Sequence, residues 1–415
     1  GSALWCWGVN YNGVLGSGLL DDFAYEEAQP IPGAWAEVAP MQERNGQEEH
    51  VCGRRLSGEL ECWGDQAFTP GVPCYGDDRP CIVEPQGAAP FTTVTTGSSV
   101  SCALAEGWPW CWGWADEAQL GFDTTSFDAR FPLPIPRTAP PVEIAAGFLG
   151  GCARTADGRV ACWGSDLYRG EVGPDPARAA FPMAGVAEAA QVAVGLSSVC
   201  VRGGDGSVRC WGGSFDDDYG FLGGESARPS DDAYAIPGLP RAVELAVGNA
   251  HGCVIGDDAS VWCWGESAAG ATGAIGGDDC AGTPCTRTPR RVEGLPGTPV
   301  ELALGGLLSL REPGFSCARL ADGRVSCWGA NGLGTLGDGT RVDSAAPVLV
   351  EGIDDAVELR GVGLHVCARR SSGEVWCWGA DLGGTLGTTA RLPACGFAPC
   401  ASAPVRATAL AGTEA

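Results

Sequence analysis

Short apolar runs in which every second residue is hydrophobic recur along the chain, and turns that contain glycine separate them. One run begins at Val142 and ends at Gly147, and similar runs cover residues 243–248 and 300–305. Alternation of this kind, bounded by turn residues, is typical of β-strands. No stretch shows a convincing helical period. The pattern therefore predicts an all-β protein built from many short strands.

Pairs of cysteines follow these runs at a nearly constant spacing. Each pair brackets a turn such as Asp157-Gly158 and a residue that resumes the alternation, such as Val160, which predicts a β-hairpin. Cys52 and Cys62 are symmetric about Ser57, so a three-residue loop places them opposite each other. Opposed Cβ atoms lie about 4.5–5.5 Å apart, close to what a disulfide needs. We therefore predict seven hairpin disulfides: Cys52–Cys62, Cys102–Cys111, Cys152–Cys162, Cys200–Cys210, Cys253–Cys263, Cys317–Cys327 and Cys367–Cys377.

Six further cysteines form short loop pairs, and one cysteine is left over. The predicted loop disulfides are Cys74–Cys81, Cys280–Cys285 and Cys395–Cys400. Metal binding is the alternative, but it needs about four thiolates around one ion, whereas two recur in each repeat. Disulfides in this number indicate a secreted, periplasmic or cell-surface protein. Cys6 is unpaired, as expected if an upstream partner has been cut away, and it is predicted to be a free thiol or an intermolecular link.

The tripeptide Cys-Trp-Gly recurs with a spacing of 48 to 64 residues, which fits the blades of a β-propeller. It begins at residues 6, 62, 111, 162, 210, 263, 327 and 377. Each unit supplies about four short strands, and one such sheet cannot bury both of its faces alone, so the units must stack and close into a ring. We expect one propeller domain over residues 3–415, with seven blades of four antiparallel strands, a partial eighth repeat at 377–415, and Gly1-Ser2 as a cloning remnant. An eighth, incomplete blade is the alternative.

The clearest copy of the repeat runs from Cys317 to Gly339 and resembles the repeat of the regulator of chromosome condensation family. The shared pattern is His-x-Cys-Ala-x4-Gly-x-Val-x-Cys-Trp-Gly-x-Asn-x-x-Gly-x-Leu-Gly, and this copy contains Ala330-Asn331-Gly332. The resemblance covers about Leu4 to about Leu410 and implies a seven-bladed propeller. It does not define a function, since the family includes a nuclear exchange factor, a plant ultraviolet-B photoreceptor and a secreted inhibitor of β-lactamases. The paired cysteines, the acidity and the lack of lysine bring the chain closer to a Cys-rich, exported bacterial-type branch.

Composition narrows the chemistry further. Asp and Glu number 51 against 26 basic residues, so the formal charge is -25, which opposes contact with a phosphate backbone and makes a nucleic-acid partner unexpected. Every basic residue is arginine, which excludes Schiff bases on lysine and the phosphate-binding loop that ends in lysine. No apolar run approaches the ~18 residues of a membrane span, and no signal peptide is visible.

The candidate chemical groups are few. His50, His251 and His365 each lie two residues before the first cysteine of a hairpin, on separate repeats, and are interpreted as structural. Among the acidic loop clusters, Asp216, Asp217 and Asp218 are the best of the weak calcium candidates, although they lack the spacing of a calcium-binding loop. We expect no catalytic residues and no cofactor, with calcium left open.

One enlarged loop is the main candidate for binding. In most repeats the hairpin cysteine comes five positions after the glycine that ends the apolar strand, whereas Cys317 comes twelve positions after Gly305. The insert, residues 306–314, offers Leu307, Leu308, Leu310, Arg311 and Glu312 as candidate partner-binding residues. Residues 42–49 form a similar expansion that should open on the same face. Loops on a rigid scaffold commonly carry binding, and a tolerated insertion is the alternative.

The sequence thus predicts an exported, disulfide-stabilised propeller, not an enzyme, that acts as a protein-binding or surface-interaction module. Two alternatives remain. A propeller enzyme, such as a lyase or hydrolase, would need acidic, basic or histidine side chains to converge in the central funnel. A structural component of a cell-surface assembly is the other.

Overall fold

A computed structural model defines most of the chain. It describes residues 4–10, 14–16, 24–40, 50–64, 81–83, 90–97, 100–114, 120, 128–134, 140–147, 150–164, 181–183, 186, 188–195, 198–212, 233–280, 282–307 and 312–408. Within these ranges the secondary structure is β-strand with connecting turns and no α-helix. No helix in this part of the chain is long and apolar enough to cross a membrane.

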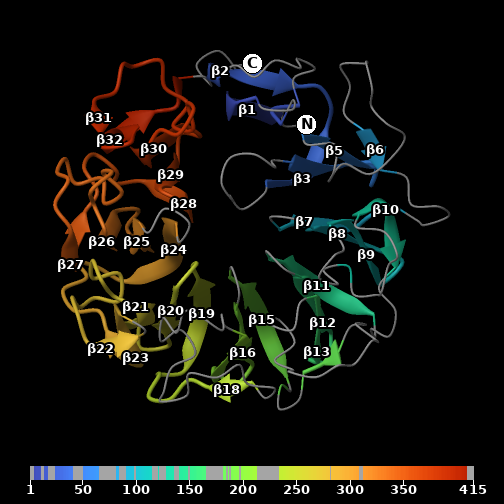
Figure 1. The fold of residues 1–415 in the computed structure, drawn as a ribbon, viewed down its shortest axis with the longest axis horizontal. Coiled ribbons are helices and arrows are strands. Elements are labelled where there is room, and N and C mark those ends of the chain that lie inside the picture. The colour runs from blue at the N-terminus through green and yellow to red at the C-terminus, as the bar shows by residue number, and fades with distance from the viewer. Residues whose placement is uncertain are drawn as a thin grey trace.

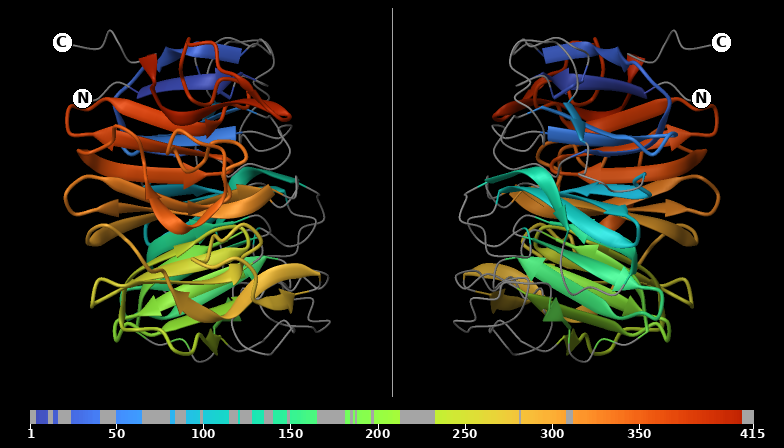
Figure 2. Two further views of the ribbon diagram at one scale, coloured as in Figure 1. Left: turned by 90° about the vertical axis from the view of Figure 1, so that its left-hand side faces the viewer. Right: turned by 90° about the vertical axis from the view of Figure 1, so that its right-hand side faces the viewer.

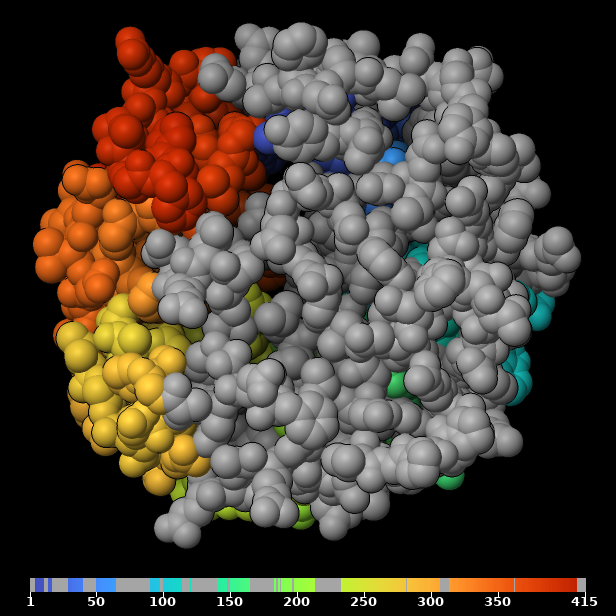
Figure 3. All heavy atoms as spheres, viewed as in Figure 1, coloured from blue at the N-terminus to red at the C-terminus, as the bar shows by residue number. Residues whose placement is uncertain are grey.

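The described strands form seven antiparallel sheets of four or five strands and one sheet of two strands. They are arranged radially around a central axis, so each sheet is the blade of a propeller (Figure 1). The side views in Figure 2 show the blades stacked around the ring, with β1 and β2 beside the blade that contains β32. Three consecutive blades, from β19 to β32, form one continuous side of the molecule (Figure 3).

Each of the seven full blades contributes strands in the same order from the axis outward. The inner strands are β3 (Trp35–Pro40), β7 (Thr93–Thr96), β11 (Pro141–Ala146), β15 (Ala189–Val194), β19 (Ala242–Val247), β24 (Pro299–Leu307) and β28 (Ala356–Val362). The second strands are β4 (His50–Arg55), β8 (Val100–Ala105), β12 (Gly150–Thr155), β16 (Ser198–Gly203), β20 (His251–Gly256), β25 (Glu312–Leu320) and β29 (His365–Arg370). The third strands are β5 (Leu60–Gly64), β9 (Trp108–Trp114), β13 (Val160–Gly164), β17 (Val208–Gly212), β21 (Val261–Glu266), β26 (Val325–Gly329) and β30 (Val375–Ala380). The outer strands are β6 (Cys81–Val83), β10 (Asp128–Pro134), β14 (Phe181–Pro182), β18 (Tyr234–Ala235), β23 (Thr283–Arg291), β27 (Ser344–Leu349) and β32 (Ala398–Arg406).

The second and third strands form the hairpins that the cysteine spacing predicts. Cys152 and Cys162 are register partners in β12 and β13, and Gly158 occupies the tight turn between them with a φ of 78°, a left-handed conformation that glycine adopts without strain. All seven hairpin disulfides are present, with Cα–Cα separations of 4.0 to 4.1 Å. Each one bridges the two central strands of its blade, and all of these cysteines except the partly exposed Cys367 are fully buried.

Two loop disulfides add a fifth strand to their blades. Cys280–Cys285 joins β22 (Asp278–Cys280) to β23, and Cys395–Cys400 joins β31 (Ala394–Cys395) to β32. The third predicted loop pair, Cys74–Cys81, lies outside the described residues because Cys74 is not placed.

Tryptophans of the Cys-Trp-Gly motif form the contacts between blades. Six of them, namely Trp112, Trp163, Trp211, Trp264, Trp328 and Trp378, are among the largest fully buried side chains. The indole N–H of Trp328 donates to the carbonyl oxygen of Ala271 in the preceding blade at 2.9 Å, and that of Trp378 donates to Thr335 at 2.9 Å. Repetition of one large apolar side chain at each interface explains why the units stack in one register.

The position of the incomplete unit differs from the sequence-based expectation. Counting from each Cys-Trp-Gly placed the partial repeat at residues 377–415, but β30 and β32 belong to a complete blade. The incomplete sheet pairs β1 (Leu4–Val9) with β2 (Ala24–Ile31), at the other end of the chain. The reason is that a blade begins at its inner strand, about half a repeat before its Cys-Trp-Gly.

Candidate binding face

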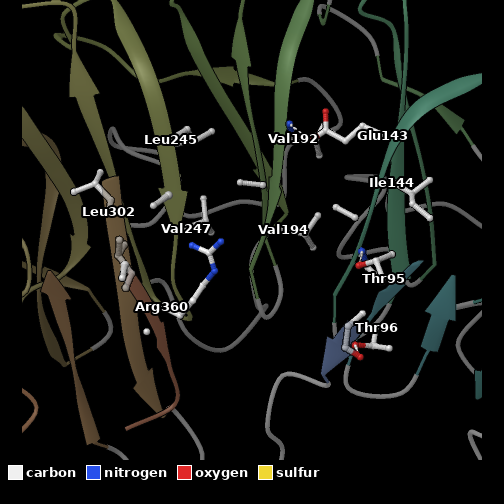
Figure 4. A pocket seen from close by; sticks show the side chains of 18 of the residues that line it. Thr95, Thr96, Glu143, Ile144, Val192, Val194, Leu245, Val247, Leu302 and Arg360 are labelled. Carbon is white, nitrogen blue, oxygen red and sulfur yellow. Dashed lines mark hydrogen bonds between the residues drawn. The ribbon is translucent and has the colours of Figure 1, made fainter. Parts of the chain in front are cut away.

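The inner strands surround a cavity of about 470 Å³ on the ring axis (Figure 4). Five of these strands present alanine at one equivalent position: Ala39, Ala145, Ala193, Ala246 and Ala303. The other two present Thr95 and Arg360 there. Small side chains at this position keep the axis open, and most residues that line the cavity are apolar, although polar atoms make up the larger part of its exposed surface.

Arg360 is the cation of this wall, and Figure 4 shows its guanidinium group pointing into the cavity. Its Nη1 atom lies 2.8 Å from Glu301, and its Nη2 atom lies 3.0 Å from Glu358. The side chain is 70% exposed, so these ion pairs orient the guanidinium group more than they stabilise the fold. The sequence analysis did not single out Arg360, although aligning Val357-Glu358-Leu359-Arg360 with the alanine-containing strands would have done so.

A Glu–Arg pair links the inner strand to the second strand of the same blade in four of the seven full blades. The pairs are Glu37–Arg54, Glu143–Arg154, Glu301–Arg319 and Glu358–Arg369. The same carboxylates also reach the next blade; Glu143, for example, accepts the backbone N–H of Val192 at 3.3 Å. Glu244 has no arginine in this set, and burial raises its pKa while it accepts the N–H of Leu302 at 2.9 Å. These carboxylates hold blades together and are already engaged.

An enzyme in the central funnel would need free acids or bases that converge on the cavity. The charged side chains that line it, Glu143 and Arg360, are both ion-paired as described above. In the described ranges, no group of three or more His, Cys, Asp or Glu side chains is arranged to hold a metal ion. The lining is therefore better suited to packing against a ligand than to proton transfer.

The histidines lie between blades. His50 Nε2 is 2.6 Å from the hydroxyl of Ser101, and His251 Nε2 is 2.9 Å from the hydroxyl of Ser316, each in the following blade. Burial lowers the pKa of both imidazoles to about 4, so both are neutral at physiological pH. His365 occupies the equivalent position of the last full blade and is partly exposed. The three histidines are not brought together, in line with a structural interpretation.

The predicted insert begins and ends as an extension of a hairpin. Leu307 and Glu312 are register partners at the tip of β24 and β25, so these two residues belong to strands and not to a loop as the sequence suggested. Leu308, Leu310 and Arg311 lie outside the described residues, as do the 42–49 expansion and Asp216, Asp217 and Asp218. The connections between inner and second strands all lie at one end of the ring, which we call the loop face. The extension therefore rises from the loop face at the rim of the cavity.

Neighbouring blades hold the base of this extension in place. Glu266, which is 4% exposed, accepts the backbone N–H of Gly314 at 3.1 Å, and burial raises the pKa of its carboxyl group. The side-chain amide of Asn249 donates to the Gly306 carbonyl oxygen, and the Gly306 N–H donates to Gly363 at 2.7 Å. Contacts from both adjacent blades thus hold the paired strand ends that lead to Leu307 and Glu312. Glu266 could not be recognised from the sequence, because its partner Gly314 lies about one repeat away.

The opposite end of the ring, which we call the turn face, carries its own apolar residues. Val142, Val243, Val300 and Val357 occupy one equivalent position near the start of their inner strands and are 39% to 54% exposed. Leu56, in a hairpin turn on the same face, is 64% exposed. The turn face is consequently a second surface that a binding experiment must distinguish from the loop face.

Comparison with known proteins agrees with this architecture. The chain is a β-propeller. Its fold is that of RCC1-type propellers, as shown by the Prp20p structure from Saccharomyces cerevisiae, which is 19% identical with a TM-score of 0.62 over 90% of this chain and 87% of that one. Yeast RCC1 (Prp20) bound to Kap60 is 21% identical, with a TM-score of 0.59 over 79% and 77%. Human WBSCR16 is 19% identical, with a TM-score of 0.63 over 86% and 94%.

A sequence match is confined to part of the chain. The human E3 ubiquitin-protein ligase HERC2 is 30% identical over 139 residues, which is 32% of this chain and 3% of HERC2, and the mouse protein matches equally. The chain therefore spans 3% of the length of these curated relatives. No protein-family model matches it.

Proposed function

We propose that this chain is an exported, disulfide-stabilised propeller that binds a partner protein through its loop face. The observation that carries the proposal is the strand-paired stem of β24 and β25, held by Glu266 and Asn249. Residues 308–311, with the sequence Leu-Ser-Leu-Arg, connect the two strands of that stem. A binding segment whose two ends are fixed by the scaffold loses less conformational entropy on binding than a free one.

The kind of partner follows from the residue types. Leu308 and Leu310 can supply an apolar centre, and Arg311 and Glu312 a polar rim, which is the usual anatomy of a protein interface. Solved propellers of this fold include one bound to Kap60 and one studied for its binding to Gsp1p and histones. These partners belong to those proteins, and they support the general class of function. The disulfides support export, because such bonds persist in oxidising compartments.

The proposal is tested by affinity capture from the culture fluid and cell envelope of the producing organism, followed by mass spectrometry. The double variant Leu308→Ser/Leu310→Ser should lose at least ten-fold of the captured partner while its melting temperature stays within about 2 °C, because surface changes rarely alter stability. Leu56→Ser and Val243→Ser, both on the turn face, are the matched controls and should capture normally.

Two results would overturn the assignment. Capture that is lost in Val243→Ser and kept in the double leucine variant would move binding to the turn face. A double variant that unfolds while its remaining folded fraction still binds would show that the leucines are part of the core.

A further inference from the structure

The sheet of β1 and β2 occupies an eighth position in the ring (Figure 1). The indole N–H of Trp7 in β1 donates to the carbonyl oxygen of Thr385 at 3.0 Å, just as Trp378 in β30 donates to Thr335 in the blade before it. Gly387 lies against the Trp7 ring as Gly337 lies against Trp378. β1 is therefore a third strand, and β2 an outer strand, of the repeat.

Among the described residues, no inner or second strand occupies this eighth position. In the seven full blades the third strand lies between a second strand and an outer strand, whereas the described part of β1 pairs with β2 alone. One edge of β1 thus offers a row of backbone N–H and C=O groups to an incoming strand. Cys6 lies on β1 at the position that Cys62 and its six counterparts occupy in their strands.

The wall formed by the last full blade, β28 to β32, is more exposed than the equivalent surface of the blade before it. Cys367 and Val375 in this wall are partly exposed, whereas Cys317 and Val325, their counterparts one blade earlier, have no exposed surface. The pair Arg369–Glu358 is 49% and 37% exposed, against 21% and 18% for Arg319–Glu301. In the preceding blade, the equivalent groups are covered by the inner and second strands of the blade that follows it.

The wall on the other side, formed by β3 and β4, has the same character. Val38 and Val51 are partly exposed and pack with Cys6 and Leu4. Their counterparts in the last blade, Leu359 and Val366, are 1% and 0% exposed. The open position therefore has partly exposed apolar side chains on both walls, together with the Arg369–Glu358 pair on one of them, and within the described ranges the strand edge between the walls has no partner.

We propose that this open position binds a β-hairpin of the repeat's own inner type: an apolar inner strand, a glycine-containing connection, and a second strand with a cysteine opposite Cys6. The argument for this occupant is that the same interface is built seven times within the chain. A helix or a small molecule would leave the edge of β1 unpaired, whereas a strand satisfies it. The hairpin's inner strand would bury the exposed groups on both walls.

A disulfide from Cys6 would then fix the hairpin. Two thiols each lose a proton and an electron as the S–S bond forms, and a molecule of oxidised glutathione accepts both electrons and becomes two thiols. Burial raises the pKa of the Cys6 thiol to about 12, so reaction with soluble reagents alone is slow. A hairpin that places its sulfur beside Cys6 overcomes this barrier through proximity.

The test uses a synthetic peptide with the sequence of residues 354–372, which form the inner hairpin of the last blade and include Cys367. Protein and peptide are incubated overnight at pH 8.5 with oxidised glutathione, and intact-mass and peptide-mapping spectra are recorded. We expect a one-to-one adduct joined at Cys6 and a rise in melting temperature of at least about 3 °C. The same peptide with Cys367→Ser should still protect β1 amides from hydrogen exchange, without an adduct.

A short peptide is poorly structured alone, so a second variant carries residues 354–372 fused after Ala415, where the effective concentration is high. Its Cys6 should be fully oxidised and its melting temperature raised, and the Cys6→Ser version of this fusion should lose the bond. The proposal is overturned if the fused cysteine stays reduced, or if a scrambled peptide forms the adduct equally well. A Cys6–Cys6 dimer as the main product would also overturn it, in favour of a second copy as the occupant.

Discussion

Acid should destabilise this protein through its interblade histidines. His50 and His251 are buried, and their pKa values are lowered to about 4 from an ordinary 6.5 because the charged form is poorly solvated. In the unfolded chain each of these histidines therefore binds a proton near pH 6.5, whereas in the folded chain it binds one only near pH 4. The contribution of each neutral histidine is complete above pH 6.5 and is lost as the pH falls toward 4. The loss approaches about 1.4 kcal/mol of unfolding free energy per pH unit for each group, and it amounts to about 2 kcal/mol for each group between pH 6.5 and 4.5.

The assay is guanidinium unfolding, with the disulfides intact, followed by tryptophan fluorescence at pH 7.5, 6.5, 5.5 and 4.5. Glu266, close to His251 at Gly314, has a raised pKa and so gains stability in acid, which opposes the histidine effect. Comparison with His251→Gln isolates the histidine, because glutamine keeps a polar nitrogen near Ser316 but does not titrate. The variant should lose about 2 kcal/mol less of its unfolding free energy than the parent over this range. In parallel, NMR of the three histidines should show no titration of His50 or His251 above about pH 5. Parallel losses in parent and variant, or a midpoint near 6.5 for His251, would refute the reasoning.

Three further changes test the packing and the covalent framework, each by chemical unfolding. The double variant Cys317→Ala/Cys327→Ala should cost about 3 kcal/mol, as expected for a disulfide that closes a loop of about ten residues, and an unchanged midpoint would contradict this. Trp328→Ala should lower the free energy of unfolding by about 3–5 kcal/mol because it leaves a cavity between two blades. Trp108 is 42% exposed, so Trp108→Ala should lower it by less than about 1 kcal/mol. Equal effects would show that Trp328 is not an interface residue. Glu301→Gln should lower the free energy of unfolding by about 1–2 kcal/mol, since Arg319 and Arg360 lose their charged partner. Glu293→Gln, which removes an exposed pair with Arg291, should be nearly neutral. Equal effects of the two changes would refute the role of Glu301 in linking blades.

Local features of the sequence were enough to predict the hairpins and the propeller. A disulfide such as Cys152–Cys162 depends on residues ten positions apart in one turn, so its register can be read from spacing. The repeat of Cys-Trp-Gly then requires similar sheets to stack, whatever their outer loops contain. Export, the partner and the role of the 306–314 insert stay predictions.

The features that sequence reasoning missed depend on neighbouring blades. Glu266 is defined by its bond to Gly314, and Arg360 by its bond to Glu301, each pair separated by about a full repeat. The misplaced partial unit has the same origin, since the start of a blade is set by which strand reaches the axis. Leu307 was assigned to a loop because strand pairing beyond Gly305 leaves no signal in a segment without clear alternation.

The positions of the hairpin disulfides also determine the order in which the molecule would unfold under a stretching force. Each of the seven bridges joins two strands of the same blade, so within the described ranges none of them staples one blade to the next. A pull applied at the chain ends would therefore separate the blades in succession, against noncovalent contacts such as the interblade tryptophan packing and the Arg360–Glu301 ion pair. Each oxidised hairpin would withhold about ten residues, or roughly 35 Å of contour length, from every step. Optical-trap records in oxidising and reducing buffer should differ by that increment, and the protein would act as an extensible tether whose step size reports its redox state.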